Sequence, residues 1–226
     1  MTEKAVSIEK FVKEQVKKWE SRYSEVQKKG QARIPVITVS MEPGSGGSVV
    51  AKGIAERLGF DLFNREIIEG IAKSSRIRSS VIETLEKERL SGIEDFISSL
   101  VKKHYMYPGI YLRHLLEIIS AIGKHGRAVI VGRGANFILP PEERFSVRVV
   151  APLETRIQNV SRAFNVSRDV AERRVITRES KRRAFVRQSF NANISDALNY
   201  DLVINTGKMT LESAVDAVIG AVMGSL

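Results

Sequence analysis

The hydrophobic and polar positions of the chain follow two periods, one typical of helices and one typical of buried strands. Short apolar runs predict five strands, at residues 36–39, 60–63, 128–131, 147–150 and 200–205. Apolar residues at three- and four-residue intervals predict helices between these strands. Strands that alternate with helices pair in parallel through right-handed crossovers. The pattern therefore predicts an α/β fold built on a parallel sheet.

The predicted helices are marked by periodicity and, in two cases, by capping residues. Helices are expected at residues 1–30, 49–59, 64–73, 153–164, 167–180 and 211–223, with Ser167 and Thr210 as N-terminal caps. Residues 74–126 have several helical patterns, interrupted at 105–109 by a sequence typical of a turn. The aromatic residues of this turn either stack on a base or, as is more frequent, pack in a core or an interface.

A glycine-rich turn directly follows the first predicted strand. Three of the four residues 44–47 are glycine, and helical periodicity begins immediately afterwards. A strand, a glycine loop and a helix together hold phosphate, because glycines let backbone N–H groups face an anion at the positive end of the helix dipole. We expect the phosphate-binding residues to be Gly44, Ser45, Gly46, Gly47 and Ser48. The alternative is a turn that only closes a βα unit.

This turn departs from the P-loop pattern G-x-x-x-x-G-K-[ST]. Aligning residues 44–46 with the last glycines of the pattern places Gly47 where lysine is expected and Val49 near the hydroxyl position. The lysine of that pattern contacts the β- and γ-phosphates, and the hydroxyl holds Mg²⁺. Both side-chain contributions are therefore expected to be missing here.

An arginine follows the third predicted strand. Arg133 lies between Gly132 and Gly134, directly after residues 128–131. In an open parallel α/β sheet, ligands bind beyond the carboxyl ends of the strands, so we predict that Arg133 contacts an anion. The alternative is an arginine held in a structural salt bridge.

The net charge of +10 is concentrated in one stretch. Residues 173–187 contain seven Lys or Arg against one Glu. A focused basic patch attracts a polyanion, either a nucleoside triphosphate or a nucleic acid. The aromatic residues in and just after the stretch, Phe185 and Phe190, are few for base stacking, and no nucleic-acid recognition motif is present, so a nucleotide is favoured.

Composition excludes several classes of function. No run of 18 apolar residues is present, and we expect neither a membrane span nor a secretion signal. The chain has no cysteine, which excludes disulfides and thiol chemistry and fits a cytoplasmic protein. Three histidines, His104, His114 and His125, have no spacing typical of a metal site, so no metal-ligating residues are predicted.

Four stretches together resemble the cytidylate kinase-like group of nucleoside monophosphate kinases, within the P-loop fold. The resemblance runs from about residue 34 to the C-terminus. It is carried by ITVSMEPGSGGSVVAKGIAERLG, FDLFNREII, AVIVGRGANFIL, and RESKRRAF followed by NYDLVINT. The resemblance implies a three-layer P-loop NTPase fold with a five-stranded parallel sheet. It also implies a kinase-like domain at 31–226, with a helical NMP-binding insert at 64–126 and a short arginine-rich lid at 174–195.

The N-terminal helix, residues 1–30, lies outside this resemblance. We expect it either to dock on its own domain or to pack on a second subunit, which would form a homodimer. Five glutamates interleave with its lysines and arginines, so adsorption to a membrane is not favoured.

The resemblance implies transfer of the ATP γ-phosphoryl, with Mg²⁺, to a nucleoside monophosphate, with CMP or dCMP as the first choice. Arg133 would hold the acceptor phosphate, and Arg156 would lie beside the donor adenine. Arg178, Arg182 and Arg183 would close over the transferring phosphoryl group. Arginine suits this role because its planar fork pairs with phosphate and keeps its charge at any working pH.

A nucleotide-binding module with weak catalysis, acting as a sensor or a partner-binding protein, is the alternative from a different class. Cytidylate kinases have lysine, a hydroxyl and an aspartate where this chain has Gly47, Val49 and Gly134. Ser45 and Ser48 also supply hydroxyls. The nearest acids that could organise a hydrated Mg²⁺ are Glu42 and Glu179. The missing residues favour the binding module, whereas the lid arginines, which could replace the lost lysine charge, favour the enzyme.

Overall fold

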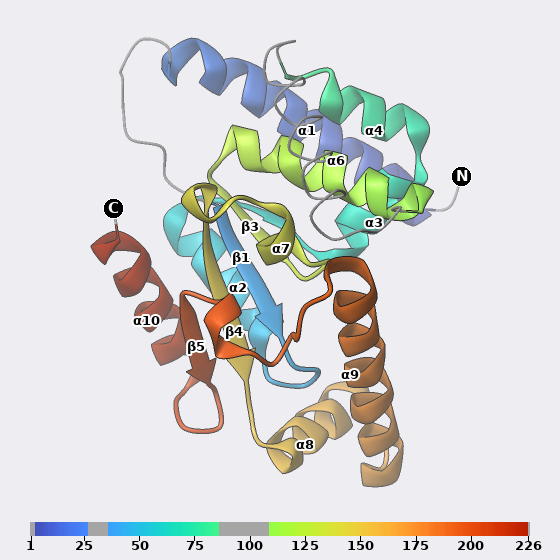
Figure 1. Cartoon of the computed structure of the whole chain (residues 1–226), viewed down its shortest axis with the longest axis vertical. Helices are drawn as coiled ribbons and strands as arrows, with labels where there is room; N and C mark the ends of the chain where they lie inside the picture. The colour runs from blue at the N-terminus through green and yellow to red at the C-terminus, as the bar shows by residue number, and fades with distance from the viewer. Residues whose placement is uncertain (1–2, 27–35, 86–108, 226) are drawn as a thin grey trace. The chain divides into compact units, whose positions relative to one another are not determined.

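The chain contains two compact units. The computed structural model describes residues 3–26, 36–85 and 109–225, whose elements are labelled in Figure 1. One unit, the sheet unit, comprises Pro35–Leu62 and Arg127–Leu226. The other, the helical unit, comprises Met1–Ile34 and Phe63–Gly126.

A five-stranded sheet forms the centre of the sheet unit. Its strands lie in the order β2-β3-β1-β4-β5, so the first strand is central. The pairs β1–β3, β1–β4 and β4–β5 are parallel. The strands are β1 (Val36–Met41), β2 (Asp61–Phe63), β3 (Ala128–Val131), β4 (Arg144–Val150) and β5 (Leu202–Asn205). The predicted α/β fold with a five-stranded parallel sheet is confirmed.

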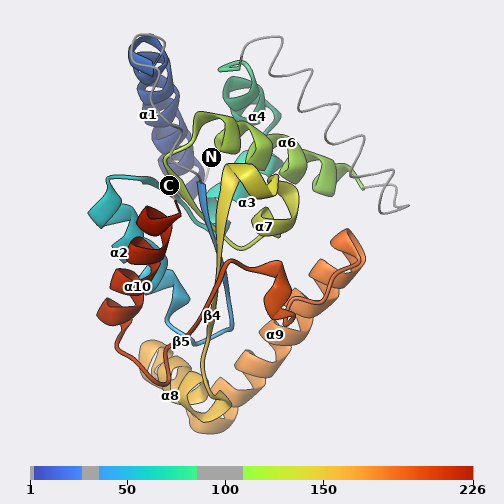
Figure 2. The ribbon, with the colours of Figure 1, turned by 60° about the vertical axis from the view of Figure 1, so that its left-hand side comes forward.

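Helices cover both faces of this sheet. On one face, α2 (Gly47–Leu58) packs with α10 (Leu211–Gly224), whereas α7 (Ala135–Ile138) lies on the other face together with the chain that follows α9 (Arg168–Phe190) (Figures 1 and 2). Helix α8 (Leu153–Phe164) packs against α9. The contact is formed by the buried residues Ile157, Val160, Ala171 and Val175. The sheet unit is therefore a three-layer α/β structure.

The two faces of the central strands differ in polarity. Because strand side chains alternate, the face toward α2 is formed by Ile37, Val39, Met41, Val147 and Val149. The opposite face is formed by Thr38, Ser40, Ser146 and Arg148, which are all buried. Central parallel strands are usually apolar on both faces. The polar face thus brings a buried arginine beneath the carboxyl edge of the sheet.

Helix α9 is longer than the sequence analysis predicts. The helix expected at 167–180 continues through most of the expected lid and ends at Phe190. The added sequence contains neither glycine nor proline, so nothing in it stops the helix. Asn191 ends α9 by adopting a left-handed conformation, with a φ of 49°. Strand β4 likewise begins at Arg144, before the predicted start at residue 147.

The helical unit contains the N-terminal helix. Its helices are α1 (Glu3–Val26), α3 (Arg65–Lys73), α4 (Ser75–Ile82) and α6 (Ile110–His125). Trp19 of α1 stacks on His125, with ring centroids 4.1 Å apart, and also on Phe63. The predicted N-terminal helix is confirmed, and it packs within the unit that contains residues 63–126. The boundaries expected at 30, 64–126 and 174–195, and the homodimer, stay predictions.

Several expectations fall outside the described residues. These are the end of the N-terminal helix at Gly30, the helical patterns between 86 and 101, His104, and most of the predicted turn at 105–109. Within the described ranges, no helix is both long enough and apolar enough to cross a bilayer.

Candidate active site

The loop that joins β1 to α2 has a conformation that requires glycine. Gly44 and Gly46 have φ values of 84° and 76°, which L side chains rarely adopt. Both the N–H and the Oγ of Ser45 bond to the carbonyl of Glu42, at 3.2 and 2.9 Å, and close a tight turn. Helix α2 begins at Gly47 without a side-chain cap. The N–H groups of its first turn therefore face the loop, where an anion can accept from them.

Residues from distant parts of the sheet unit hold this loop in place. Asn159 of α8 donates through Nδ2 to the Gly44 carbonyl at 2.9 Å. Thr206, which follows β5, donates through Oγ1 to the Ser45 carbonyl at 2.7 Å. The sequence analysis identified neither residue. Thr206 follows the carboxyl end of a strand, as Arg133 does, so the rule that selected Arg133 applies to it as well.

Gly47 has no space for a side chain. A Cβ at this position would lie 2.5 Å from Met41 Cβ and 3.2 Å from Val149 Cβ. Met41 stands five residues before Gly46, where the P-loop pattern has its first glycine. The chain therefore has a large residue where the pattern has glycine, and glycine where the pattern has lysine. The Met41 side chain fills the space that a lysine at position 47 would need.

The hydroxyl of the P-loop pattern is present, one residue earlier than the sequence analysis assigned it. Ser48 directly follows Gly47 and therefore occupies the [ST] position. Val49, which the sequence analysis placed there, is the next residue and is 56% exposed. Ser48 is exposed in the first turn of α2, so the loop lacks the lysine but keeps the hydroxyl.

Arg182 reaches from α9 to the end of β1, next to the glycine loop. Its Nη1 donates to the carbonyl oxygen of Met41 at 2.5 Å, at the end of β1. Arg182 is half-buried, as expected for a side chain that points from α9 toward the sheet. An arginine of the predicted lid thus lies next to Met41, whose side chain leaves no space for a lysine at position 47.

A charged cluster lies beside this contact and includes four residues that were singled out from the sequence. Arg156 is buried, and its Nη1 donates to Glu179 at 2.8 Å. The Nε of Arg156 lies 3.3 Å from Glu42 Oε2 and donates to the Ala151 carbonyl at 3.0 Å. Arg183 also donates to Glu179. Both acids expected near Mg²⁺ are therefore paired with arginine.

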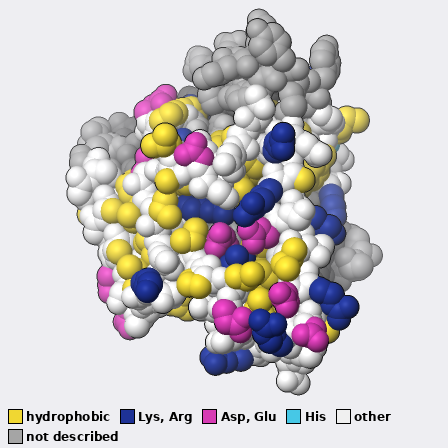
Figure 3. All heavy atoms as spheres, turned by 60° about the horizontal axis from the view of Figure 1, so that its bottom comes forward, with side chains coloured by type: hydrophobic (Ala, Val, Ile, Leu, Met, Phe, Trp, Pro, Cys, Tyr) yellow, Lys and Arg dark blue, Asp and Glu magenta, His cyan; other side chains and the backbone are white. Residues whose placement is uncertain are grey.

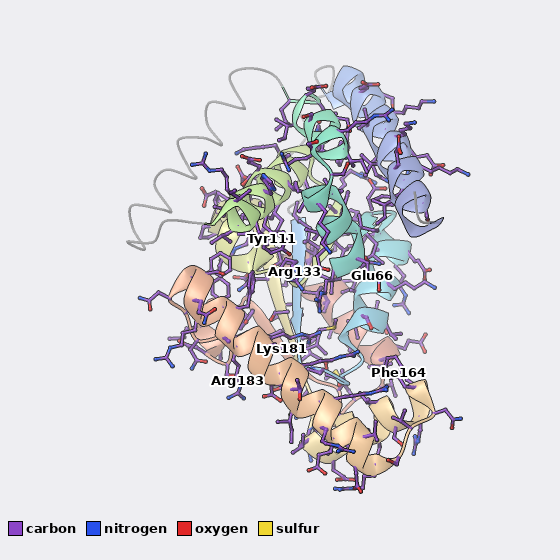
Figure 4. All side chains as sticks on the ribbon, turned by 90° about the vertical axis from the view of Figure 1, so that its right-hand side faces the viewer. Glu66, Tyr111, Arg133, Phe164, Lys181 and Arg183 are labelled. Carbon is purple, nitrogen blue, oxygen red and sulfur yellow. The ribbon has the colours of Figure 1, made fainter. Side chains whose placement is uncertain are left out.

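The remaining two arginines stack on aromatic rings at different places along α9. Arg178 stacks with its guanidinium 5.6 Å from the centroid of Phe164, at the N-terminal half of α9. Arg133 lies over Phe185, at 5.5 Å, near the C-terminal half. Figure 4 labels Arg133 and Phe164 at separate places, with Lys181 and Arg183 on α9 itself. Of the predicted lid arginines, Arg182 and Arg183 contact the loop or the cluster beside it, and Arg178 contacts α8.

Acidic side chains accompany the basic ones where α8 meets the start of α9, just before the basic stretch. Toward the bottom of Figure 3, where α8 and the start of α9 lie, Lys and Arg side chains are interleaved with Asp and Glu. Arg168 there pairs with Glu154 at 2.8 Å and with Glu172 at 3.2 Å. Interleaved charges of this kind do not favour a nucleic-acid surface, which needs uncompensated positive charge along a backbone.

The acids of the site do not fit as direct Mg²⁺ ligands. Glu42 and Glu179 are engaged by arginines, and a carboxylate would have to leave these partners to bind a cation. Among the residues that the structure describes, no group of three or more His, Cys, Asp or Glu is arranged to hold a metal. The Ser48 hydroxyl is suited to an ion that is already bound to phosphate oxygens.

Glu179 makes the stability of the protein depend on pH. Burial raises the pKa of its carboxyl, but hydrogen bonds from Arg156 and Arg183 outweigh burial, and the net pKa is lowered. Such a group stabilises the fold above the unfolded-state pKa of about 4.3, and the stabilisation is lost as the pH falls through the lower folded-state pKa. We expect Glu179→Gln to lose less unfolding free energy than the wild type between pH 7 and about pH 3. Urea titrations at both pH values test this, and equal losses in the two proteins would contradict it.

The five-stranded parallel sheet and the glycine loop between β1 and α2 together are those of the P-loop class of folds. The chain belongs to the cytidylate kinase-like family, whose sequence model matches residues 36–208. The family expected from the four sequence stretches is therefore confirmed.

Individual relatives match along most of their length. The cytidylate kinase of Methanocaldococcus jannaschii is 27% identical over 190 residues, which cover 83% of this chain and 97% of that protein. The cytidylate kinase of Ignicoccus hospitalis is 26% identical over 183 residues, which cover 81% and 96%. The crystal structure of an uncharacterized protein from Eubacterium ventriosum is similar in fold, with a TM-score of 0.64 at 21% identity, covering 83% of this chain and 98% of that chain.

Proposed function

We propose that this protein transfers the γ-phosphoryl group of ATP to a nucleoside monophosphate, with CMP or dCMP as the first acceptors to test. One observation carries the proposal: Arg182 donates to the Met41 carbonyl and so brings a permanent charge to a glycine loop that lacks lysine. Relatives named cytidylate kinase, similar over more than four-fifths of this chain, support the choice of acceptor. The reaction belongs in the cytoplasm, which also suits a chain without cysteine.

Phosphoryl transfer asks a protein mainly for positioning and for positive charge on the phosphate oxygens. The N–H groups at the start of α2, with Gly44, Ser45, Gly46 and Gly47, would hold the donor phosphates. Arg133, at the carboxyl end of β3, would hold the acceptor phosphate. Arg182 would stabilise the charge that develops on the transferring group, because a guanidinium stays protonated and pairs with phosphate oxygens.

The other predicted residues would act after a change of partner. Arg183 would have to leave Glu179, and Arg178 would have to leave Phe164, before either could contact a phosphate. Both side chains are exposed, so neither is locked in its present contact. Ser48 would hold Mg²⁺ that arrives on the nucleotide, and the ion would neutralise part of the phosphate charge.

A nucleotide-binding module with weak catalysis is the second candidate, and two packing contacts favour it. At Gly47 the Met41 side chain excludes the lysine. At Gly134, where cytidylate kinases have an aspartate, a Cβ would lie 2.2 Å from the Phe190 ring, and the φ of 70° is itself unfavourable for aspartate. Neither position can recover its usual residue without repacking.

A coupled ADP-release assay distinguishes the two candidates. The protein is supplied with ATP, Mg²⁺ and a panel of nucleoside monophosphates, and thermal shifts are measured with the same ligands. Turnover well above background with one monophosphate supports the kinase. A raised melting temperature without turnover supports the binding module. If the ligands cause neither turnover nor a thermal shift, both candidate functions are contradicted.

Arg133→Ala is expected to raise the KM for the acceptor about 10- to 100-fold, the loss associated with one charge-assisted phosphate contact. A matched control is Arg127→Ala at the other end of β3. Arg127 has a φ of 49° and stacks over Phe60 at 5.6 Å, close to the 55° and 5.5 Å of Arg133. It precedes β3, so it lies at the amino edge of the sheet, away from bound ligand. Equal effects of the two substitutions would contradict the assignment of Arg133.

A further inference from the structure

Arg156 occupies an interior position between two carboxylates. Only 6% of the residue is exposed. Its guanidinium faces Glu42 on one side, at 3.3 Å, and donates to Glu179 on the other, at 2.8 Å. A third contact, from Nε to the Ala151 carbonyl, fixes the plane of the group. Arg156 is therefore engaged on several sides by its own chain.

The two carboxylates belong to different parts of the candidate site. Glu42 is the first residue after β1, and its carbonyl accepts both bonds that close the turn at Ser45. Its carboxylate also accepts from the Ala151 N–H at 3.1 Å. Glu179 lies on α9, close to Arg182, which contacts Met41. Helix α9 is thus connected to the start of the loop in two ways. Arg182 binds Met41 directly, and Arg156 bridges Glu179 of α9 to Glu42.

Only an arginine can make this connection. A buried charge is tolerated when it is paired and hydrogen-bonded, and Arg156 meets this condition through Glu42 and Glu179. The guanidinium donates from Nε and Nη1 in fixed, diverging directions, whereas a lysine ammonium is a single point charge on a flexible stem. A lysine at 156 could not hold the same geometry at Ala151, Glu42 and Glu179 at once.

We propose that Arg156 is a positioning residue that holds the turn of the phosphate loop and helix α9 in one arrangement and thereby sets Arg182 on the loop. Loosening the contact on α9 then loosens the loop, although the two are far apart in the sequence. The structural part of the proposal stands on the contacts alone. Its kinetic part rests on the proposed phosphoryl transfer.

Amide hydrogen exchange of the nucleotide-free full-length protein tests the coupling. We expect exchange in residues 42–48 to become roughly tenfold faster in Arg156→Lys and in Glu179→Gln, since each removes a charge-assisted bond. Two substitutions are matched controls: Arg162→Lys, at an exposed position of α8, and Glu172→Gln, at a half-buried position of α9 where the carboxylate pairs with Arg168. Circular dichroism selects the variants that are folded. Unchanged loop exchange in folded Glu179→Gln overturns the proposal even if Arg156→Lys fails to fold.

Steady-state kinetics separate this role from general destabilisation. A positioning defect should lower kcat in Glu179→Gln at least tenfold while the acceptor KM changes less, because the cluster holds the loop between β1 and α2, whereas the acceptor phosphate is assigned to Arg133 at the carboxyl end of β3. If the wild type has no turnover, the proposed function fails, but the exchange result still decides the coupling. Faster loop exchange with an unchanged kcat would reject the kinetic part alone.

Discussion

Arg182→Ala is expected to lower kcat about 100- to 1,000-fold, the loss that follows removal of one preorganised donor from a transition state. The reason lies in the loop, where Gly47 supplies no side chain and Arg182 donates to the carbonyl of Met41. Removing Arg182 would take away the cation that contacts the end of β1 and would leave only arginines that are already paired with Glu42 and Glu179 in the neighbouring cluster. Steady-state assays of ADP release with the preferred monophosphate measure the effect.

The matched control for this prediction is Lys181→Ala. Lys181 is the preceding residue of α9, has the same charge and is exposed, so its removal changes the net charge equally. We expect its kcat to stay within about threefold of the wild type, as is usual for surface substitutions. Unchanged turnover in Arg182→Ala, or an equal loss in Lys181→Ala, would show that Arg182 does not replace the missing lysine.

The sheet and several helix ends were predictable because short-range signals mark them. Strand β3 matches the predicted run at 128–131, which glycines flank closely on both sides. Thr210 caps α10 as predicted, and its side chain accepts from the Ser213 N–H. Such features depend on residues only a few positions apart, so propensity and spacing are sufficient to locate them.

The predicted end of α9 is too early, because its many charged residues leave only a weak helical period of apolar positions. Its buried residues are widely spaced among many Lys and Arg, and Val186 and Phe190 lie beyond the end that was predicted. Tertiary contacts determine where this helix ends: Phe190 packs on Phe137, with ring centroids 5.3 Å apart. A pattern read along one segment contains no information about such a contact.

The cluster around Arg156 could not be derived from spacing. Glu42, Arg156 and Glu179 come from a loop and two helices, and their meeting depends on how α8 packs on α9. Both acids were predicted as possible neighbours of Mg²⁺, because no sequence pattern reveals that arginines engage them. The double departure from the P-loop pattern, in contrast, can be seen in the sequence. The pattern has glycine at position 41 and lysine at position 47, whereas this chain has Met41 and Gly47.

Gly47→Lys is expected to destabilise the protein, although it restores the residue that the P-loop pattern requires. The added Cβ would lie 2.5 Å from Met41 Cβ and 3.2 Å from Val149 Cβ, which are atoms close to the backbone of two paired strands. Such atoms cannot rotate away, so we expect a loss of about 3 kcal/mol or more in the free energy of unfolding, the upper range for overpacking. Urea denaturation measures it.

The control is a glycine-to-lysine change without the clash. Gly220 lies in α10, and a Cβ there meets nothing within 4 Å. Because lysine is a better helix former than glycine, we expect Gly220→Lys to leave stability equal or raise it by up to about 1 kcal/mol. If Gly47→Lys is as stable as Gly220→Lys, the proposed exclusion of lysine by Met41 is wrong.

The double substitution Met41→Gly with Gly47→Lys tests whether a lysine can be accommodated in the loop and can replace the charge of Arg182. Removing the Met41 side chain opens the space that the lysine needs, so the two substitutions should be coupled by at least about 1 kcal/mol in the stabilising direction. The double variant would then have a loop cation of its own. Adding Arg182→Ala to it should lower kcat far less than Arg182→Ala does alone, because the lysine would supply the charge that Arg182 otherwise brings from α9. An equally large loss in both backgrounds would mean that Arg182 has a role that a lysine in the loop cannot fill.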